Sequence, residues 1–246
     1  ASDVAAVGDY IYVTSRGRLS VFDVANPASP PRVNLSRVHH GVDADMAASG
    51  DYVYRAVESG GLEVLDVTDP EMPVRVDIPV FPLAYALDVA AAGNYAYVVG
   101  GDSFRGGDFH VIDMTDPTSP QRIGGAVTPG EASHVVLSGD YAFVLESRFR
   151  DRESGLRVID ITDPAAPFLV GGVGTPGFAR SLAIAGAHAC VAADSLGLQV
   201  IDIADPTNPW IAGIVDTPGR AADVAARGDH AYVADESGGL QVIGIT

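Results

Sequence analysis

The sequence has no lysine, one cysteine and few positive charges, and each shortage argues against a class of protein. Its 15 basic residues are all arginine and stand against 32 acidic residues, which gives a formal net charge of −17. A surface this negative repels phosphate backbones and anionic lipid headgroups, so binding to nucleic acid or to a membrane surface is disfavoured. No apolar run approaches the roughly 18 residues that a membrane-spanning helix needs, so we expect no membrane insertion.

The lone cysteine, Cys190, cannot form an internal disulfide. It lies in the mainly apolar segment 187–192, which predicts a buried small side chain rather than a reactive thiol. The composition, 47% apolar and 19% charged, is typical of a folded chain. The sequence also lacks the periodicity of amphipathic helices, which argues against a helical solenoid.

The sequence does contain an internal repeat. A Gly-Asp-Tyr marker recurs, with changes, every 42 to 47 residues, and its glycines are Gly8, Gly50, Gly93, Gly139, Gly186 and Gly228. A second marker, the last residue of an L-x-V-x-D pattern, keeps in phase with the first at Asp23, Asp66, Asp113, Asp160 and Asp202, with Gly244 in the sixth place. Two markers in phase predict six structural repeats.

Each repeat holds four short segments rich in β-branched and aromatic residues and bounded by turn residues. In the fourth repeat they cover 134–137, 141–145, 156–161 and 168–173. Gly139-Asp140 predicts a tight hairpin turn with positive φ, and we expect the acids around the Asp-Pro-x-x-Pro segments to be turn formers. Four antiparallel strands in each repeat predict an all-β, six-bladed β-propeller with a single domain. The predicted blades cover about 1–43, 44–86, 87–132, 133–179, 180–221 and 222–246.

The strings LEVLDV (62–67), LRVIDI (156–161) and LQVIDI (198–203), each followed by an Asp-Pro-x-x-Pro segment, resemble the LVIVD repeat family. The string GDYAFV (139–144) resembles the other half of that repeat, and the resemblance covers nearly the whole chain. It implies a β-propeller from bacteria or archaea that is extracellular, periplasmic or attached to the cell surface. The family carries no catalytic motif, so the resemblance implies no catalytic residue.

The sixth repeat departs from the others because it stops after its third strand. We therefore expect a last blade that lacks its outer strand, and a sequence that is part of a longer protein. The edge of the segment 240–245 would carry unpaired backbone N–H and C=O groups, which are a template for strand pairing. We expect this edge to pair with a missing segment or with another chain.

One position of the repeat, five residues before each marker glycine, carries mostly polar side chains. Each innermost strand begins there, so we expect a ring near the mouth of the central channel formed by Asp3, Asp45, Asp88, His134, Ser181 and Asp223. A hard cation such as Ca²⁺ could bind Asp3, Asp45, Asp88, His134 and Asp223. The same side chains could instead hydrogen-bond backbone groups and tie adjacent blades together, a role that every blade needs. We favour ties and no cofactor, with Ca²⁺ at the channel mouth as the alternative.

Two neighbouring loops between second and third strands, Gly100–Gly107 and Glu146–Glu153, contain insertions. Together with the connections into later innermost strands, they supply arginine and aromatic side chains: Phe104, Arg105, Arg148, Phe149, Arg150, Arg152, Arg180 and Arg220. Insertions in single repeats often map to a binding face, and guanidinium groups suit a carboxylate, a sulfate, an acidic glycan or an acidic protein segment. The alternative is local neutralisation, because acidic residues lie among the same arginines.

The sequence contains neither a G-x-S-x-G nor an H-E-x-x-H motif. We therefore expect a non-enzymatic binding or scaffold propeller whose protein or glycan partner docks over blades 3 and 4. Two alternatives stay open. One is a metal-dependent hydrolase at the channel mouth, by analogy with six-bladed calcium-dependent lactonases. The other is a structural module of a larger surface assembly.

Overall fold

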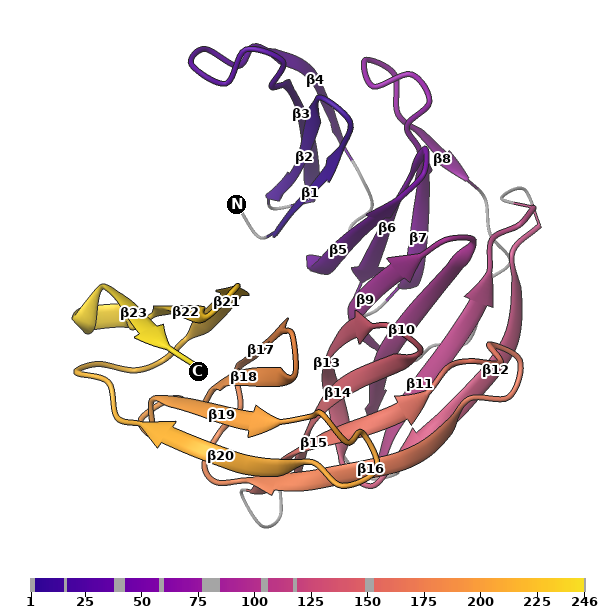
Figure 1. Ribbon diagram of the computed structural model, residues 1–246. Coiled ribbons are helices and arrows are strands. Elements are labelled where there is room, and N and C mark those ends of the chain that lie inside the picture. Colours follow the sequence, from indigo (N-terminus) through magenta and orange to yellow (C-terminus); the bar gives the residue numbers. More distant parts are fainter. Residues whose placement is uncertain are drawn as a thin grey trace. The chain divides into compact units, whose positions relative to one another are not determined.

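Figure 1 shows a computed structural model of the chain, an all-β fold of six antiparallel sheets. The structure describes residues 3–15, 17–37, 43–57, 60–76, 85–102, 106–116, 119–148 and 153–245. Each sheet is a meander in which consecutive strands pair, and the sheets follow one another along the chain. Five sheets have four strands and the last has three, which confirms the predicted blades of a six-bladed β-propeller.

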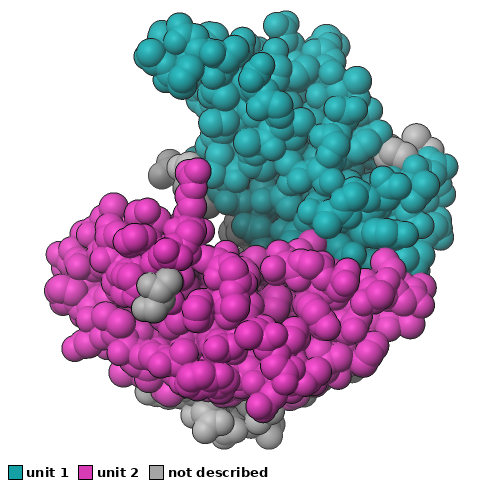
Figure 2. All heavy atoms as spheres, in the orientation of Figure 1, with its two compact units in different colours: residues 1–102, 109–124 teal, residues 103–108, 125–246 magenta. Residues whose placement is uncertain are grey.

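The chain divides into two compact units, coloured teal and magenta in Figure 2. Unit 1 comprises residues 1–102 and 109–124, and unit 2 comprises residues 103–108 and 125–246. The first three sheets belong mainly to unit 1, and the last three belong to unit 2.

The first three sheets follow the predicted blades 1 to 3. The first consists of β1 (Asp3–Val7), β2 (Tyr10–Ser15), β3 (Arg18–Asp23) and β4 (Arg32–Arg37). The second consists of β5 (Asp43–Ser49), β6 (Tyr52–Val57), β7 (Gly61–Asp66) and β8 (Val74–Val76). The third consists of β9 (Ala86–Ala92), β10 (Tyr95–Asp102), β11 (Gly106–Asp113) and β12 (Gln121–Thr128).

The last three sheets follow blades 4 to 6. The fourth sheet consists of β13 (Glu131–Ser138), β14 (Tyr141–Arg148), β15 (Glu153–Asp160) and β16 (Phe168–Thr175). The fifth consists of β17 (Ser181–Ala185), β18 (His188–Ala192), β19 (Leu198–Asp202) and β20 (Trp210–Val215). The sixth consists of β21 (Asp223–Arg227), β22 (His230–Ala234) and β23 (Leu240–Gly244), with a short 3₁₀ turn η1 (Glu236–Gly238). Within the described residues, no helix has the length and apolar character needed to cross a membrane.

Each inner hairpin turns at the marker glycine, as predicted. All six marker glycines have φ between 55° and 57°, a region that residues with a side chain rarely adopt. In the fourth sheet, the residue after Gly139 then accepts a backbone hydrogen bond from beyond the third strand, from Ile161 N to Asp140 O at 2.9 Å. Equivalent bonds recur in the other five sheets, so one local sequence signal sets the same hairpin six times.

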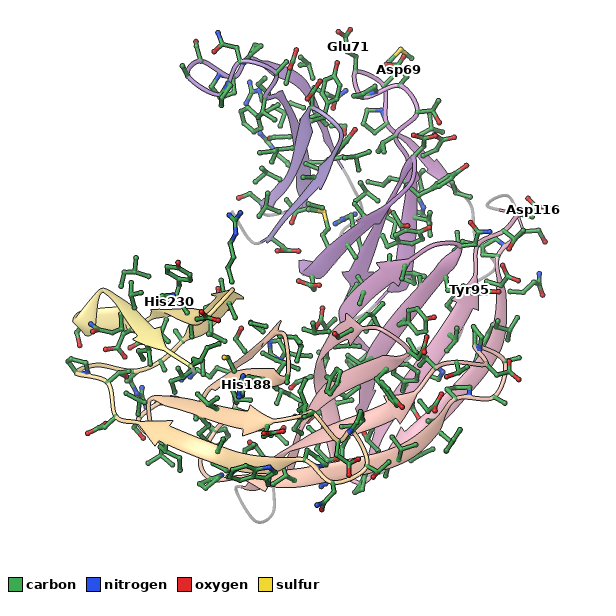
Figure 3. All side chains as sticks on the ribbon, in the orientation of Figure 1. Asp69, Glu71, Tyr95, Asp116, His188 and His230 are labelled. Atoms are coloured by element: carbon green, nitrogen blue, oxygen red, sulfur yellow. The ribbon has the colours of Figure 1, made fainter. Side chains whose placement is uncertain are left out.

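The acidic residues around the Asp-Pro-x-x-Pro segments are turn formers, which confirms that prediction. Asp160 Oδ1 accepts a hydrogen bond from Thr162 N at 2.9 Å, and Asp163 Oδ1 accepts one from Ala165 N at 3.0 Å. The first of these bonds has counterparts at Asp23, Asp66, Asp113 and Asp202. Figure 3 labels Asp69 and Glu71 at the turn between β7 and β8, where Glu71 N donates to Asp69 Oδ1 at 3.0 Å. These carboxylates therefore stabilise the turns by accepting hydrogen bonds from backbone N–H groups.

The hydrophobic core lies between neighbouring sheets within each unit. In unit 1 it joins the first sheet to the second, through residues such as Tyr12 and Val53, and the second to the third. In unit 2 it joins the fourth sheet to the fifth, through residues such as Leu156 and Val191, and the fifth to the sixth. Cys190 is fully buried, as predicted, and burial raises the pKa of its thiol to about 11.

The inserted segments are shorter as loops than the sequence suggests. β14 continues through Arg148 and β15 begins at Glu153, so the fourth hairpin pairs Glu146 with Gly155 and Arg148 with Glu153. β10 and β11 extend in the same way into the predicted loop Gly100–Gly107. The predicted loops were too long. The paired strands continue into the inserted residues through backbone hydrogen bonds, although the side chains there are polar and follow no regular alternation.

Candidate functional site

The structure describes only part of the predicted arginine and aromatic cluster. Arg148 is the last residue of β14, and its side chain lies outside the described part of the structure. The other predicted residues of the two insertions also lie outside the described residues: Phe104, Arg105, Phe149, Arg150 and Arg152. Arg180 and Arg220 are described, and both belong to unit 2.

Arg180 and Arg220 lie in the connections that lead into β17 and β21. Arg180 N donates to Ala192 O at 2.8 Å, which fixes the first connection to the end of β18. Asp194 and Ala221 exchange two backbone hydrogen bonds of 3.2 and 2.9 Å, which fix the second connection to the turn between β18 and β19. Two chain segments from successive blades are thus held at a single turn.

The carboxylate of Asp194 joins the two arginines. Arg180 Nε donates to Asp194 Oδ2 at 2.7 Å and its Nη2 group contacts the same oxygen, while Arg220 Nε lies 2.7 Å from Oδ1. The Asp194 side chain is 9% exposed, whereas the Arg180 and Arg220 side chains are 41% and 58% exposed. A nearly buried anion therefore holds two cations that face the solvent.

The contacts with the two arginines also determine the protonation state of Asp194. Burial opposes ionisation of Asp194, but the hydrogen bond from Arg180 and the positive charges of Arg180 and Arg220 outweigh it and hold its pKa below the ordinary value. The carboxylate is therefore ionised at neutral pH, and the three side chains together carry one net positive charge. This is a cationic spot on a chain with a formal net charge of −17.

Two exposed apolar side chains accompany the arginines. Phe178 is 51% exposed and Leu196 is 40% exposed. Gly177 has φ 77°, and a Cβ atom added there would lie 2.8 Å from Leu196 Cδ1, so Leu196 packs on the glycine backbone beside Phe178. Phe178 and Arg220 take the same place in successive connections, because each follows a Thr-Pro-Gly segment. The segments that carry Arg180 and Asp194 thus also carry an exposed apolar side chain each, Phe178 and Leu196.

In blades 4 and 6, an acidic side chain also binds the connection that leads into the innermost strand, but in the part of the chain that the structure describes it pairs with no exposed arginines. In blade 4 the buried Glu146 accepts hydrogen bonds from Gly130 N at 2.8 Å and Arg157 Nε at 2.7 Å. In blade 6 the buried Asp235 accepts bonds from Thr217 Oγ1 at 2.6 Å and Gly219 N at 2.7 Å. Asp194 is thus the one acid at this place, among the described residues of unit 2, that holds two exposed arginines.

The burial of Glu146 corrects one expectation from the sequence. The sequence predicts that Glu146 lies in a solvated loop, where it would neutralise the inserted arginines. Because β14 continues past it, its side chain is instead buried and pairs with Arg157 on β15. An acid that recurs seven or eight residues after the marker glycine in blades 4, 5 and 6 is the sequence signal that could have identified Glu146 and Asp194 as partners of the connections. No comparable signal pointed to Phe178 or Leu196.

The predicted channel-mouth residues of unit 1 lie close together. Asp45 forms side-chain hydrogen bonds with both Asp3 and Asp88, and Asp88 Oδ1 also accepts a bond from Val89 N at 2.7 Å. Burial, with the Asp45 carboxyl group adding to it, raises the pKa of Asp3 to about 7. Burial, with the Asp88 carboxyl group adding to it, raises the pKa of Asp45 to about 9, although the hydrogen bond with Asp3 acts in the opposite direction. Carboxyl groups that share hydrogen bonds need a bound proton between them, so this cluster is partly protonated at neutral pH.

The corresponding residues of unit 2 form a different tie. Ser181 Oγ donates to Asp223 Oδ1 at 2.5 Å, and Val224 N donates to the same oxygen at 2.8 Å. Burial lowers the pKa of His134, although the negative charge of Asp223 opposes this effect. Ser181 and Asp223 belong to successive blades, so this side-chain pair links two adjacent innermost strands.

The predicted metal site gains no support from this geometry. Within the described residues, no group of three or more His, Cys, Asp or Glu side chains is arranged to hold a metal ion. Calcium at the channel mouth stays a prediction.

Six antiparallel sheets with repeated turns define the chain as a β-propeller, and the sequence comparison gives its family. The profile of the LVIVD repeat matches residues 1–34, 41–78, 84–128, 129–175, 176–217 and 218–246. The chain belongs to the LVIVD-repeat family, as the sequence indicated. No curated protein sequence matches it.

Solved structures are similar in fold at low sequence identity. The β-propeller domain of Cps50 (Swd1) from Myceliophteria thermophila has a TM-score of 0.76 and 13% identity, over 100% of this chain and 84% of that one. A functionally unknown protein from Desulfotomaculum acetoxidans has a TM-score of 0.73 and 16% identity, over 96% and 79%. BamB from Moraxella catarrhalis has a TM-score of 0.66 and 13% identity, over 98% and 69%. These likenesses show the propeller fold.

Proposed function

We propose that this LVIVD-repeat propeller is a non-enzymatic binding or scaffold protein that takes an acidic ligand on the face formed by Arg180, Asp194 and Arg220. The carrying observation is the single, nearly buried carboxylate that holds two solvent-exposed guanidinium groups. The exported or cell-surface location that the family resemblance implies belongs to the same proposal.

The arginine pair is suited to binding because part of its hydrogen-bonding capacity is free and its position is fixed. A guanidinium group has five N–H donors, of which Arg180 uses its Nε and Nη2 groups on Asp194, while Arg220 forms an ion pair with the same carboxylate. The remaining donors can form the two parallel bonds by which arginine recognises a carboxylate. Because Asp194 already restricts both side chains, a ligand has less conformational entropy to remove on binding.

The charge of the whole chain limits the kind of ligand. At physiological ionic strength the Debye length is about 8 Å, so a small acidic group at Arg180 and Arg220 is attracted by the local pair. A long polyanion would extend over the rest of the surface and be repelled by a chain of net charge −17. We therefore propose a ligand with one or two acidic groups, carried by a protein or glycan partner.

We propose that the inserted segment of blade 4 takes part in the same binding, because its arginines suit an acidic partner. Arg148 ends β14, and β14 ends on the same side of its sheet as the connection that supplies Gly130 to Glu146.

The test compares peptide binding by wild type with that of an arginine variant and a matched control. Arg220→Gln removes one guanidinium of the pair, while Arg227→Gln removes the same charge from an exposed position at the last residue of β21. On an array of acidic peptides and their amide counterparts, we expect wild type and Arg227→Gln to prefer the acidic peptides. We expect Arg220→Gln to lose about tenfold in affinity, the value of one charge-assisted contact. Equal losses in the two variants would place the ligand elsewhere.

A further inference from the structure

We infer that the ligand of the Arg180–Arg220 pair is an acidic peptide segment in which a carboxylate side chain is followed by an apolar side chain, with the apolar group received by Phe178 and Leu196. This inference rests on the proposed function and specifies its partner. The observation that carries it is an exposed aromatic residue, Phe178, two residues before Arg180, and an exposed aliphatic residue, Leu196, two residues after the Asp194 that pairs with both arginines.

The backbone around Phe178 is fixed on both sides. Ala179 N donates to Ser154 Oγ at 3.1 Å, and Arg180 N donates to Ala192 O at 2.8 Å. On the other side, Gly177 is covered by Leu196. Phe178 therefore stays exposed although its neighbours are held firmly, and little further ordering of the segment is needed for a ligand to contact the ring.

The residue type at this position also sets blade 5 apart within unit 2. The residue after the Thr-Pro-Gly segment is Glu131 in blade 4, Phe178 in blade 5 and Arg220 in blade 6. Two of the three are charged, as expected for a solvent-facing connection. The aromatic exception lies in the blade whose Asp194 pairs with two arginines, and it precedes one of them, Arg180, by two residues.

The pairing of charge and apolar surface favours a peptide over other anions. A sulfate or phosphate ion would engage the guanidinium groups and leave Phe178 and Leu196 in water. A glycan acid would present hydroxyl groups to the same two side chains, and burying hydroxyl groups without partners is costly. A carboxylate side chain next to an aliphatic or aromatic side chain engages the guanidinium groups through the first and the apolar pair through the second.

The experiment uses three acetylated and amidated tetrapeptides, so that no terminal carboxylate contributes. Their sequences are Gly-Glu-Phe-Gly, Gly-Glu-Ser-Gly and Gly-Gln-Phe-Gly. Each is titrated by NMR into the intact chain as wild type, Phe178→Ser, Arg220→Gln and Arg227→Gln. Because Phe178 is half exposed, we expect Phe178→Ser to fold as wild type does, and thermal unfolding checks this.

We expect wild type to bind the Glu-Phe peptide roughly fivefold more tightly than the Glu-Ser peptide, the size of a modest aromatic contact. Phe178→Ser should remove that difference and leave binding of the Glu-Ser peptide unchanged. Equal affinity of wild type for these two peptides would overturn the inference, while the proposed function would stand if Arg220→Gln still weakened both. If Arg220→Gln and Arg227→Gln bound both peptides as wild type does, the inference and the proposed function would fail together.

Discussion

The two units use different chemistry at one position of the repeat, the position five residues before the marker glycine. In unit 1 this position holds three aspartates, and Asp45 forms hydrogen bonds with both Asp3 and Asp88. In unit 2 the hydroxyl of Ser181 donates to the carboxylate of Asp223. Both units thus tie one innermost strand to the next with a short polar contact.

The comparison shows that two different pairs, two aspartates or a serine and an aspartate, can link innermost strands at this position. Serine supplies its O–H donor at any pH. An aspartate supplies a donor only while it is protonated, and desolvation favours that form. The tie in unit 1 therefore depends on bound protons, whereas the Ser181–Asp223 tie in unit 2 does not need one.

The largest change in the free energy of unfolding should come from placing two aspartates in unit 2, as unit 1 has at this position. Ser181→Asp places a second carboxyl group at a buried position, next to the more exposed carboxylate of Asp223. At pH 8 we expect the free energy of unfolding to fall by roughly 1–3 kcal/mol, because the new charge loses water and is repelled by Asp223. At pH 4 the new carboxyl group can be protonated and donate as serine does, so the loss should be small. Chemical denaturation at both pH values measures this.

Ser181→Asn is the matched control for that substitution, since it changes the size of the side chain in a similar way without adding a charge. We expect its cost to be similar at both pH values. A loss with Ser181→Asp that did not depend on pH would mean that shape rather than charge is limiting, and the proposed difference between the two ties would be wrong.

The second effect is the pH dependence of unit 1 itself. The folded pKa values of about 7 for Asp3 and about 9 for Asp45 lie above the unfolded value of 3.8. Their protons therefore contribute stability that is complete below pH 3.8 and is lost as the pH rises through about 7 and then about 9. The slope should approach 1.4 kcal/mol per pH unit for each proton lost, about the value of one pKa unit.

Asp45→Asn tests this slope because an amide keeps both a donor and an acceptor without titrating. We expect stability to fall between about pH 5 and about pH 9 in wild type and to be flatter in the variant. Hydrogen exchange of peptides from β1, β5 and β9 would show whether the change lies in unit 1. Parallel pH profiles for the two proteins would contradict shared protons at Asp45.

The sequence predicted the fold well because its signals are local and repeated. Gly139 needs positive φ for a tight turn, and Asp160 needs only a backbone N–H two residues away, so both can be inferred without tertiary structure. The end of β14 could not be inferred in the same way. Whether Glu146 continues the strand depends on its pairing with Gly155 across an insertion of polar residues, which no periodic pattern marks.

The candidate site was less accessible to sequence reasoning. Arg180 and Arg220 were predicted to lie on a common surface, but not that Asp194 joins them. That contact requires the connections into blades 5 and 6 to meet one turn, and it is fixed by the backbone bonds between Asp194 and Ala221. Whether the two connections contact the same turn depends on how neighbouring sheets pack. The alternation of side chains within one blade does not show this.

A smaller effect should follow from deleting the Ser181 hydroxyl. Ser181→Ala removes the hydrogen bond to Asp223 Oδ1 and a longer contact, 3.4 Å, with Val224 N. We expect a loss of about 1 kcal/mol, since Asp223 keeps its bond from Val224 N. The loss should be the same at about pH 5 and about pH 9 in chemical denaturation, in contrast to the slope expected for unit 1. A pH-dependent loss would mean that this tie also relies on a bound proton.

The smallest effect concerns Asp194, and its sign is opposite to that of the unit 1 aspartates. Its folded pKa is lowered, so its ion pairs contribute stability that is present above the unfolded value of 3.8 and is lost as the pH falls through the folded pKa. Because Arg180 and Arg220 are 41% and 58% exposed, solvent screening should keep this contribution below about 1 kcal/mol.

Asp194→Asn removes the charge while keeping the shape, so the stability difference from wild type should shrink as acid is added below about pH 4. Over the same range, the unit 1 aspartates should hold their stabilising protons. Acid should therefore loosen the turn between β18 and β19 while leaving the innermost strands of unit 1 intact. Thermal unfolding of wild type and variant across this range measures the difference. A constant difference between them would mean that Asp194 holds the arginines by shape and hydrogen bonding rather than by charge.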